Sequence, residues 1–116
     1  MTVRTSAARC NFDFSGTHVA ITGGGQGLGR AYAKAFAAAG AAVFILDRNF
    51  ENGCKVTDEI KAADGTAFAY QLDVGRLDDV SDVFSTIIND HGRIDVLVNN
   101  AAIFTTLEMK PFYSID

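Results

Sequence analysis

Residues 22–29 read Thr-Gly-Gly-Gly-Gln-Gly-Leu-Gly, between a short apolar run at 18–21 and an alanine-rich stretch from Arg30 onward. This order predicts a strand that turns tightly into a helix. Such a turn presents unpaired backbone N–H groups and the positive end of the helix dipole, which together bind a phosphate. Glycines at 23, 27 and 29 would allow a tight turn, close approach of a ligand and close packing of helix on strand. The stretch therefore predicts a phosphate-binding turn in the structural context that such a turn requires.

The rest of the sequence repeats this alternation of strand and helix. The run Ala-Val-Phe-Ile-Leu-Asp at 42–47 is continuously apolar up to its acid, as is typical of a buried parallel strand. Each predicted helix is long enough for a right-handed crossover, so the strands should be parallel, with helices on both faces. We expect an α/β fold, a Rossmann-type three-layer αβα sandwich with strand order 3-2-1-4. The predicted strands are 18–22, 42–47, 66–72 and 94–98, and the predicted helices are 26–39, 49–63 and 77–89.

Hydrophobic periodicity also predicts which faces of the helices are buried. The clearest amphipathic pattern is in 77–89, where apolar residues recur at helical spacing up to Ile88. In the first helix, Gly40 is the expected C-terminal stop. The stripe expected to be buried there consists of Leu28, Ala31, Ala35, Phe36 and Ala39.

Composition sets limits on the class of protein. The 116 residues carry a net charge of −4 and are 48% hydrophobic, which is ordinary for a single soluble domain. The acidic balance disfavours a nucleic acid or an anionic membrane as partner. No apolar run reaches 18 residues, so no membrane span is expected. We expect one domain over 1–116, with 1–12 as a flexible arm.

The cysteines and histidines do not predict a metal centre. Cys10 and Cys54 are far apart and form no Cys-x-x-Cys pair, and the only histidines are His18 and His91. A zinc site is therefore not expected. Two reduced thiols are typical of a cytoplasmic protein, which is the location we expect.

Asp47 ends the second predicted strand, 18 residues after Gly29. An acid at this place can accept hydrogen bonds from the hydroxyls of an adenosine ribose. A carboxylate would also repel a 2′-phosphate, which favours NAD over NADP. The neighbouring Arg48 could pair with such a phosphate and keeps NADP open. A surface loop acid or a helix cap is the alternative interpretation of Asp47.

Polar residues also follow the third and fourth predicted strands, at Asp73 and at Asn99-Asn100. The carboxyl ends of parallel strands face one crevice, so these residues should converge there with Thr22 and Asp47. Asp73 has the alternative role of capping the next helix together with Gly75. For Asn99 we favour an amide that ties neighbouring strands together over one that contacts a ligand.

Taken together, these motifs resemble the classical type of the short-chain dehydrogenase/reductase family. The resemblance rests on Thr-Gly-x-x-x-Gly-x-Gly at 22–29, Asp47, Asp73-Val74 and Asn99-Asn100-Ala101-Ala102, and runs from about Asp13 to the last residue. The chain departs from the family pattern at Ala102, where glycine is usual, and at Gly75, where serine or threonine is usual. The resemblance implies a dinucleotide-binding domain in which the pyrophosphate lies against Gly23, Gln26, Gly27, Leu28 and Gly29, the adenosine ribose lies between Asp47 and Arg48, the adenine borders Asp73 and Val74, and Asn100 and Ala101 lie against a ribose.

The family's reaction is hydride transfer between a nicotinamide and an alcohol or carbonyl, with proton transfer by a tyrosine that a lysine four residues later activates. None of the three tyrosines, Tyr32, Tyr70 and Tyr113, begins a Tyr-x-x-x-Lys motif. We therefore assign no catalytic residue and expect a sheet truncated after its fourth strand, with an apolar edge at 94–98. The resemblance implies an alcohol or carbonyl substrate and a homo-oligomer for the full-length protein, and we expect the 116-residue chain alone to be inactive.

Two other classes remain as alternatives. The chain could be a non-catalytic nucleotide-binding module, completed by another chain. A Rossmann methyltransferase also places an acid after its second strand, but the Thr-Gly start, Arg30 and the Asn99-Asn100 pair argue against it. A P-loop NTPase is excluded because no Gly-Lys-Ser/Thr follows the glycines.

Overall fold

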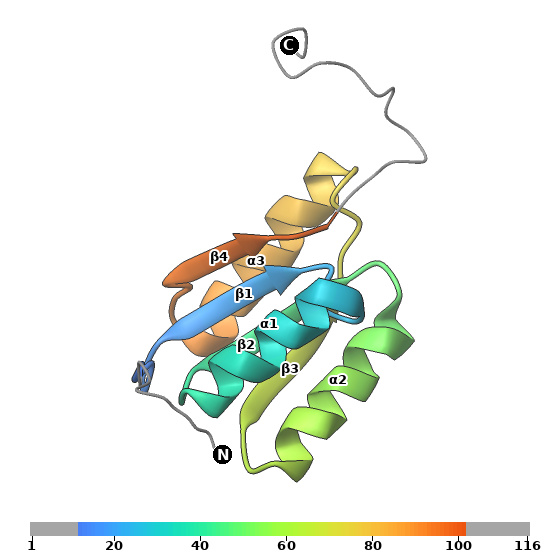
Figure 1. Ribbon diagram of the computed structural model, residues 1–116. Coiled ribbons are helices and arrows are strands. Elements are labelled where there is room, and N and C mark those ends of the chain that lie inside the picture. The colour runs from blue at the N-terminus through green and yellow to red at the C-terminus, as the bar shows by residue number, and fades with distance from the viewer. Residues whose placement is uncertain (1–11, 102–116) are drawn as a thin grey trace, which may run out of the picture.

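The computed structural model describes residues 12–101, which form a parallel sheet with flanking helices (Figure 1). The expected arm at 1–12 lies outside the described residues except for Phe12, and residues 102–116 also lie outside them. The four strands pair in the order β3-β2-β1-β4, as predicted. The elements are β1 (His18–Thr22), α1 (Gly27–Ala38), β2 (Ala42–Asp47), α2 (Phe50–Ala62), β3 (Thr66–Gln71), α3 (Leu77–His91) and β4 (Val96–Asn99).

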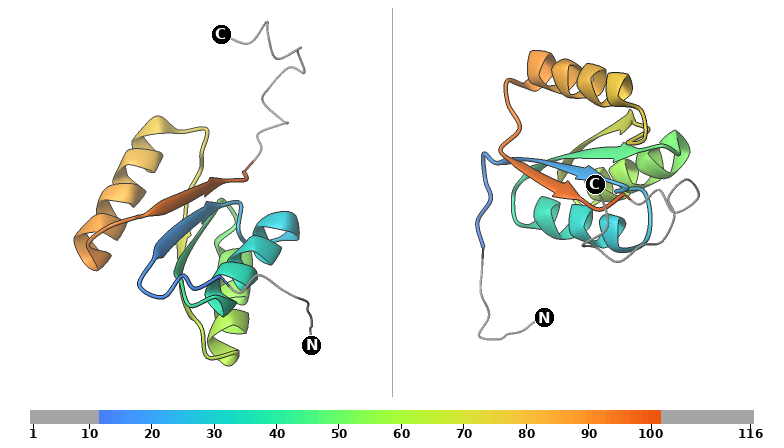
Figure 2. Two further views of the ribbon diagram at one scale, coloured as in Figure 1. Left: turned by 60° about the vertical axis from the view of Figure 1, so that its left-hand side comes forward. Right: turned by 90° about the horizontal axis from the view of Figure 1, so that it is seen from above.

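The sheet lies between two helical layers, with α1 and α2 on one face and α3 on the other (Figure 2). Side chains alternate across the strands, so Val19 and Val43 pack toward α1 and α2 while Ala20 and Phe44 pack toward α3. Val19 of β1 is in register with Val43 of β2 and Val96 of β4. Two apolar cores, one on each face, therefore hold the central strands in place.

The buried face of α1 differs from the predicted stripe. Gly29, Ala33 and Ala37 are buried against the sheet, whereas Leu28 is 61% exposed. Residues four apart lie on the same face of a helix, so Gly29, Ala33 and Ala37 form a row of small residues. This row lets the helix approach the sheet closely. The prediction was wrong for Leu28, Ala31 and Ala35, which are exposed, because it ranked positions by hydrophobicity, whereas small residues form this interface. Phe36 packs against the core on this face, as expected.

The connection between α3 and β4 also differs in detail from the prediction. The helix continues to His91 rather than Asn89, and Gly92 ends it with a φ of +94°. The strand begins at Val96 rather than Ile94. Positive φ is the conformation that glycine adopts without steric cost, which explains a helix end at this residue.

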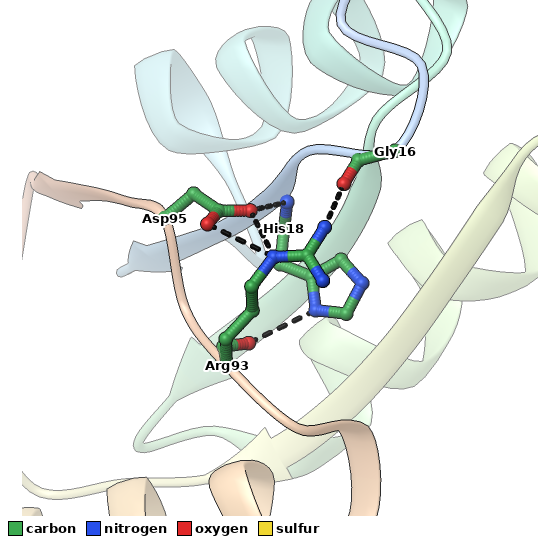
Figure 3. Close-up of polar contacts among 4 residues, drawn as sticks. All are labelled: Gly16, His18, Arg93 and Asp95. Atoms are coloured by element: carbon green, nitrogen blue, oxygen red, sulfur yellow. Dashed lines mark hydrogen bonds and ion pairs between the residues drawn. The ribbon is translucent and has the colours of Figure 1, made fainter.

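A polar cluster fixes this connection to the beginning of β1 (Figure 3). The Asp95 carboxylate accepts the backbone N–H of His18 at 2.8 Å and the Arg93 Nε–H at 3.0 Å. Arg93 also donates to the Gly16 carbonyl, and its own carbonyl lies 2.9 Å from His18 Nδ1. We call Gly16, His18, Arg93 and Asp95 the amino-end cluster, because it lies where the parallel strands β1 and β4 begin.

Within the described residues, β4 is an edge strand that pairs only with β1. Leu97 on this strand is 50% exposed. The apolar edge that the sequence predicts is therefore present in the part of the chain that the structure describes.

Candidate functional site

A cavity of about 500 Å³ lies at the carboxyl ends of the strands. This volume is within the range of small-molecule sites. Four loops that are remote in sequence meet here, as expected for an open parallel sheet. The lining residues are Gly23, Gln26, Gly27, Asp47, Arg48, Asn49, Asn52, Leu72, Asp73, Val74, Asn100 and Ala101.

All residues that the sequence predicts to contact a dinucleotide line this cavity except Leu28 and Gly29. Thr22 and Asn99, which were also expected at this crevice, do not line it. The Leu28 side chain is mostly exposed to solvent. A Cβ atom on Gly29 would lie 2.1 Å from the Gly23 carbonyl oxygen, so a side chain at this position would collide with the preceding turn. Gly29 thus permits the contact between α1 and the turn, and any ligand contact by these two residues stays a prediction.

The glycine-rich turn has the backbone shape that the sequence predicts. Gly23 and Gly27 have φ angles of +66° and +58°, which residues other than glycine rarely adopt. A Cβ atom on Gly23 would lie 3.1 Å from Ala101 Cα. Gln26 precedes α1 and makes no side-chain hydrogen bond that caps the helix. The start of α1, where helix N–H groups have no partner within the helix, therefore directly follows this glycine turn, an arrangement that fits a bound phosphate.

Asp47 is held at the rim of the cavity by backbone hydrogen bonds. Its Oδ2 accepts the Gly25 N–H and its Oδ1 accepts the Asn49 N–H, both at 2.9 Å. Helix α2 is capped instead by Asn49, whose Oδ1 accepts the Asn52 N–H at 3.1 Å. Because each carboxylate oxygen has a second lone pair, Asp47 keeps the capacity to accept ligand hydroxyls.

Thr22 joins the first and fourth strands at the opposite side of the cavity. Its hydroxyl, which is buried, accepts the N–H groups of Asn100 at 2.9 Å and Ala101 at 3.0 Å. The Asn100 side-chain amide donates to the Gly23 carbonyl at 3.2 Å. Asn99 Oδ1 lies 3.2 Å from the Thr22 hydroxyl, so Asn99 does tie neighbouring strands.

Asp73 combines a place on the cavity wall with a structural role before α3. Its Oδ1 accepts the Gly75 N–H at 2.9 Å, and its own N–H donates to Asp79 Oδ2 at 2.8 Å. The N-cap residue of α3 is Arg76, not Gly75. Gly75 therefore belongs to a turn closed by Asp73, and sequence reasoning missed the contact of Asp79 with this loop.

Three lining residues, Asn49, Asn52 and Leu72, were not expected from the sequence. Asn49 had a local signal, because asparagine just before a helix and two residues after Asp47 is a typical cap. Asn52 had no local signal, since its side chain reaches the cavity only through the packing of α2 beside the glycine turn. Within residues 12–101, no group of three or more His, Cys, Asp or Glu side chains is placed to hold a metal ion. None of the described helices is long and apolar enough to span a bilayer.

Comparison with known proteins gives consistent matches. The family model described as short chain dehydrogenase matches residues 17–116. The short-chain dehydrogenase/reductase homolog YusS of Bacillus subtilis is 40% identical over 90 residues, a match that covers 77% of this chain and 83% of that relative.

Two solved structures extend the comparison. A metagenomic short-chain oxidoreductase in complex with NADP has a TM-score of 0.74 and 36% identity, over 77% of this chain and 40% of that one. A 3-ketoacyl-(acyl-carrier-protein) reductase from Brucella melitensis, complexed with NADH, has a TM-score of 0.72 and 37% identity, over 78% of this chain and 36% of that one. The chain thus spans less than half of each of these two solved proteins.

Proposed function

Because this chain belongs to the short-chain dehydrogenase family, we propose that its cavity binds a nicotinamide adenine dinucleotide. The observation that carries this proposal is the junction of a glycine turn at the start of α1 with a fixed carboxylate at the end of β2. The two solved relatives described above, with NADP and NADH, support it. When bound, the dinucleotide supplies a nicotinamide that exchanges hydride with an alcohol or carbonyl.

Each wall of the cavity has a proposed part in binding. The pyrophosphate accepts hydrogen bonds from the glycine turn and the first turn of α1 (Gly23, Gln26, Gly27, Leu28 and Gly29). Asp47 and Arg48 flank the adenosine ribose, and Asp73 and Val74 border the adenine. Asn100 and Ala101, which Thr22 holds in place, lie against a ribose.

We propose that NAD is preferred over NADP. The Asp47 carboxylate is held at the rim by two backbone N–H groups, so it cannot turn away from a phosphate at low cost. A 2′-phosphate beside it would place like charges in close contact, which is unfavourable. The Arg48 guanidinium would attract a 2′-phosphate and so favours NADP. The measured affinities for NADH and NADPH decide between the effects of Asp47 and Arg48.

The test is Asp47→Ala, with binding of NADH and NADPH followed by isothermal titration calorimetry. Loss of a charged hydrogen-bond acceptor should weaken NADH binding about 10- to 100-fold. NADPH binding should be unchanged or improved, because the repulsive charge is gone. Asp58→Ala, which removes an exposed acid of α2 away from the cavity, is the control for net charge. Equal losses for both dinucleotides would contradict the assignment.

For the full-length protein we propose hydride transfer to or from an alcohol or carbonyl, in a cytoplasmic homo-oligomer. The purified 116-residue chain should bind the dinucleotide without turnover, since no Tyr-x-x-x-Lys is present in it. Steady-state reduction of NAD by this chain would refute that expectation. A second candidate is a nucleotide-binding module without hydride transfer. The match that covers 83% of YusS supports it, because that relative is little longer than the matched 90 residues.

A further inference from the structure

Asn52, in the first turn of α2, contacts the glycine turn. Its side-chain amide donates to Gln26 Oε1 at 3.4 Å, across 26 residues of sequence. The same turn is also held by Asp47, which accepts the Gly25 N–H. Asn52, Gln26 and Asp47 all line the cavity.

Gly25 lies against both Asp47 and Asn52 and has no room for a side chain. A Cβ atom on Gly25 would lie 2.6 Å from Asp47 Oδ2 and 2.8 Å from Asn52 Cβ. The glycine turn is therefore packed against both the carboxylate at the end of β2 and the first turn of α2. The position of α2 thus sets where the turn, and Gln26 with it, stands relative to Asp47.

We propose that Asn52 is a positioning residue of the dinucleotide site, which acts by holding Gln26 and the glycine turn against Asp47 before the ligand binds. The inference rests on the proposed function. Its physical basis is preorganisation, because a turn already held in its binding conformation loses less conformational freedom when the pyrophosphate arrives. Gln26 has no capping bond to α1, so its hydrogen bond to Asn52 is the contact that restrains its side chain among the described residues.

Asn52→Ala isolates this role cleanly. The cap of α2 uses the backbone N–H of residue 52, which the substitution keeps. The contact with Gly25 is made by the Cβ and backbone of residue 52, which alanine also keeps. Only the amide that reaches Gln26 is removed.

The test is a double-mutant cycle on the full 116-residue chain, with NADH as the probe in isothermal titration calorimetry. Asn52→Ala and Gln26→Ala should each weaken NADH binding about three- to tenfold, the range of one neutral hydrogen bond. Because Asn52 acts through Gln26, the double variant should bind NADH no more weakly than the single variant that has the lower NADH affinity. The urea midpoint should stay unchanged for Asn52→Ala, and Glu51→Ala, an exposed neighbour outside the cavity, should bind as the unchanged chain does.

The outcomes separate this inference from the proposed function. Additive losses in the cycle, or unchanged NADH affinity in Asn52→Ala, would overturn the positioning role while dinucleotide binding stands. A fall in the urea midpoint that accounts for the whole loss would assign Asn52 to folding alone and also overturn it. If the unchanged chain binds no NADH, the proposed function fails and the inference fails with it.

Discussion

Similar polar contacts have different roles at the amino ends and at the carboxyl ends of the strands. At the amino end, Asp95, Arg93 and His18 satisfy one another and the Gly16 carbonyl across more than 70 residues of sequence (Figure 3). At the carboxyl end, Thr22 and Asp47 also join distant segments, but around a cavity of about 500 Å³. At the amino end, the polar groups bond to one another and fix the strands. At the carboxyl end, the polar groups also hold the backbone in place, but they keep hydrogen-bonding capacity for a ligand.

This difference has a consequence for mutations. A change at the carboxyl end should alter both stability and dinucleotide binding, because the same groups shape the turn and face the cavity. A change at the amino end should alter stability and leave binding intact, because no residue of the amino-end cluster lines the cavity. The predictions below test this separation from the largest expected effect to the smallest.

The largest effect is expected from Gly29→Ala. A Cβ atom 2.1 Å from the Gly23 carbonyl oxygen forces α1 away from the turn, since neither partner is a flexible side chain. Overpacking typically costs about 1–3 kcal/mol in the free energy of unfolding, and a collision of a Cβ atom with backbone belongs at the upper end of this range. Urea denaturation should show this loss, and NADH binding should be abolished.

Gly27→Ala is the matched comparison for that prediction. No atom lies within 4 Å of a Cβ atom on Gly27, so only its φ of +58° opposes a side chain. The left-handed conformation costs about 1–2 kcal/mol for an alanine. If Gly27→Ala destabilises the chain as much as Gly29→Ala does, close packing of α1 on the turn is not the reason for the glycine.

An intermediate effect is expected from Thr22→Val, which removes the hydroxyl that accepts the Asn100 and Ala101 N–H groups. Leaving such donors without a partner costs about 1–3 kcal/mol. NADH binding should weaken as well, because Asn100 and Ala101 form one wall of the cavity. Urea denaturation and calorimetric titration of the same preparation measure the two effects.

Thr57→Val provides the control for that substitution. Thr57 is also buried, but its hydroxyl has no hydrogen-bond partner in the part of the chain that the structure describes. Replacing it with an isosteric apolar side chain should be neutral or stabilising. A loss equal to that of Thr22→Val would show that the hydrogen bonds of Thr22 are not what matters.

The strand order and most of the cavity lining could be predicted because their signals are local. Glycines mark the turn, and Asp47 and Asp73 each follow an apolar strand directly. Parallel topology then brings the strand ends together by geometry alone. The predicted residues that follow directly on the end of a strand therefore line the cavity, and their contact with a dinucleotide stays a prediction.

The residues that were missed depend on contacts between elements that local patterns do not encode. Asn52 reaches the cavity because α2 packs beside a turn 26 residues earlier. Leu28 was placed on the wrong face of α1 because alanines on several faces make the hydrophobic pattern ambiguous, and close approach to the sheet selects Gly29, Ala33 and Ala37. Which residues of α1 and α2 face the sheet or the cavity therefore depends on packing between distant elements, not on the residues adjacent in sequence.

The smallest effect is expected at the amino end, from Asp95→Asn. A hydrogen bond from the His18 backbone N–H, with further help from Arg93, lowers the pKa of Asp95 below its usual value, although partial burial opposes this. A carboxyl whose pKa is lower in the folded chain adds stability above its unfolded pKa of about 4, and this is lost as the pH falls through the folded pKa. Asp95→Asn should therefore lower the urea midpoint slightly at pH 7, and the difference should shrink as the pH falls below about 4.

Asp58→Asn, which removes an exposed acid of α2 outside the amino-end cluster, is the control for the change in net charge. NADH affinity at pH 7 should be the same for Asp95→Asn as for the unchanged chain, since the amino-end cluster is remote from the cavity lining. A weakened NADH affinity in Asp95→Asn would contradict the separation of the two ends. It would mean that the register of β4 against β1, which Asp95 helps to fix at the beginning of both strands, is transmitted along four paired residues to Asn100 at the cavity wall.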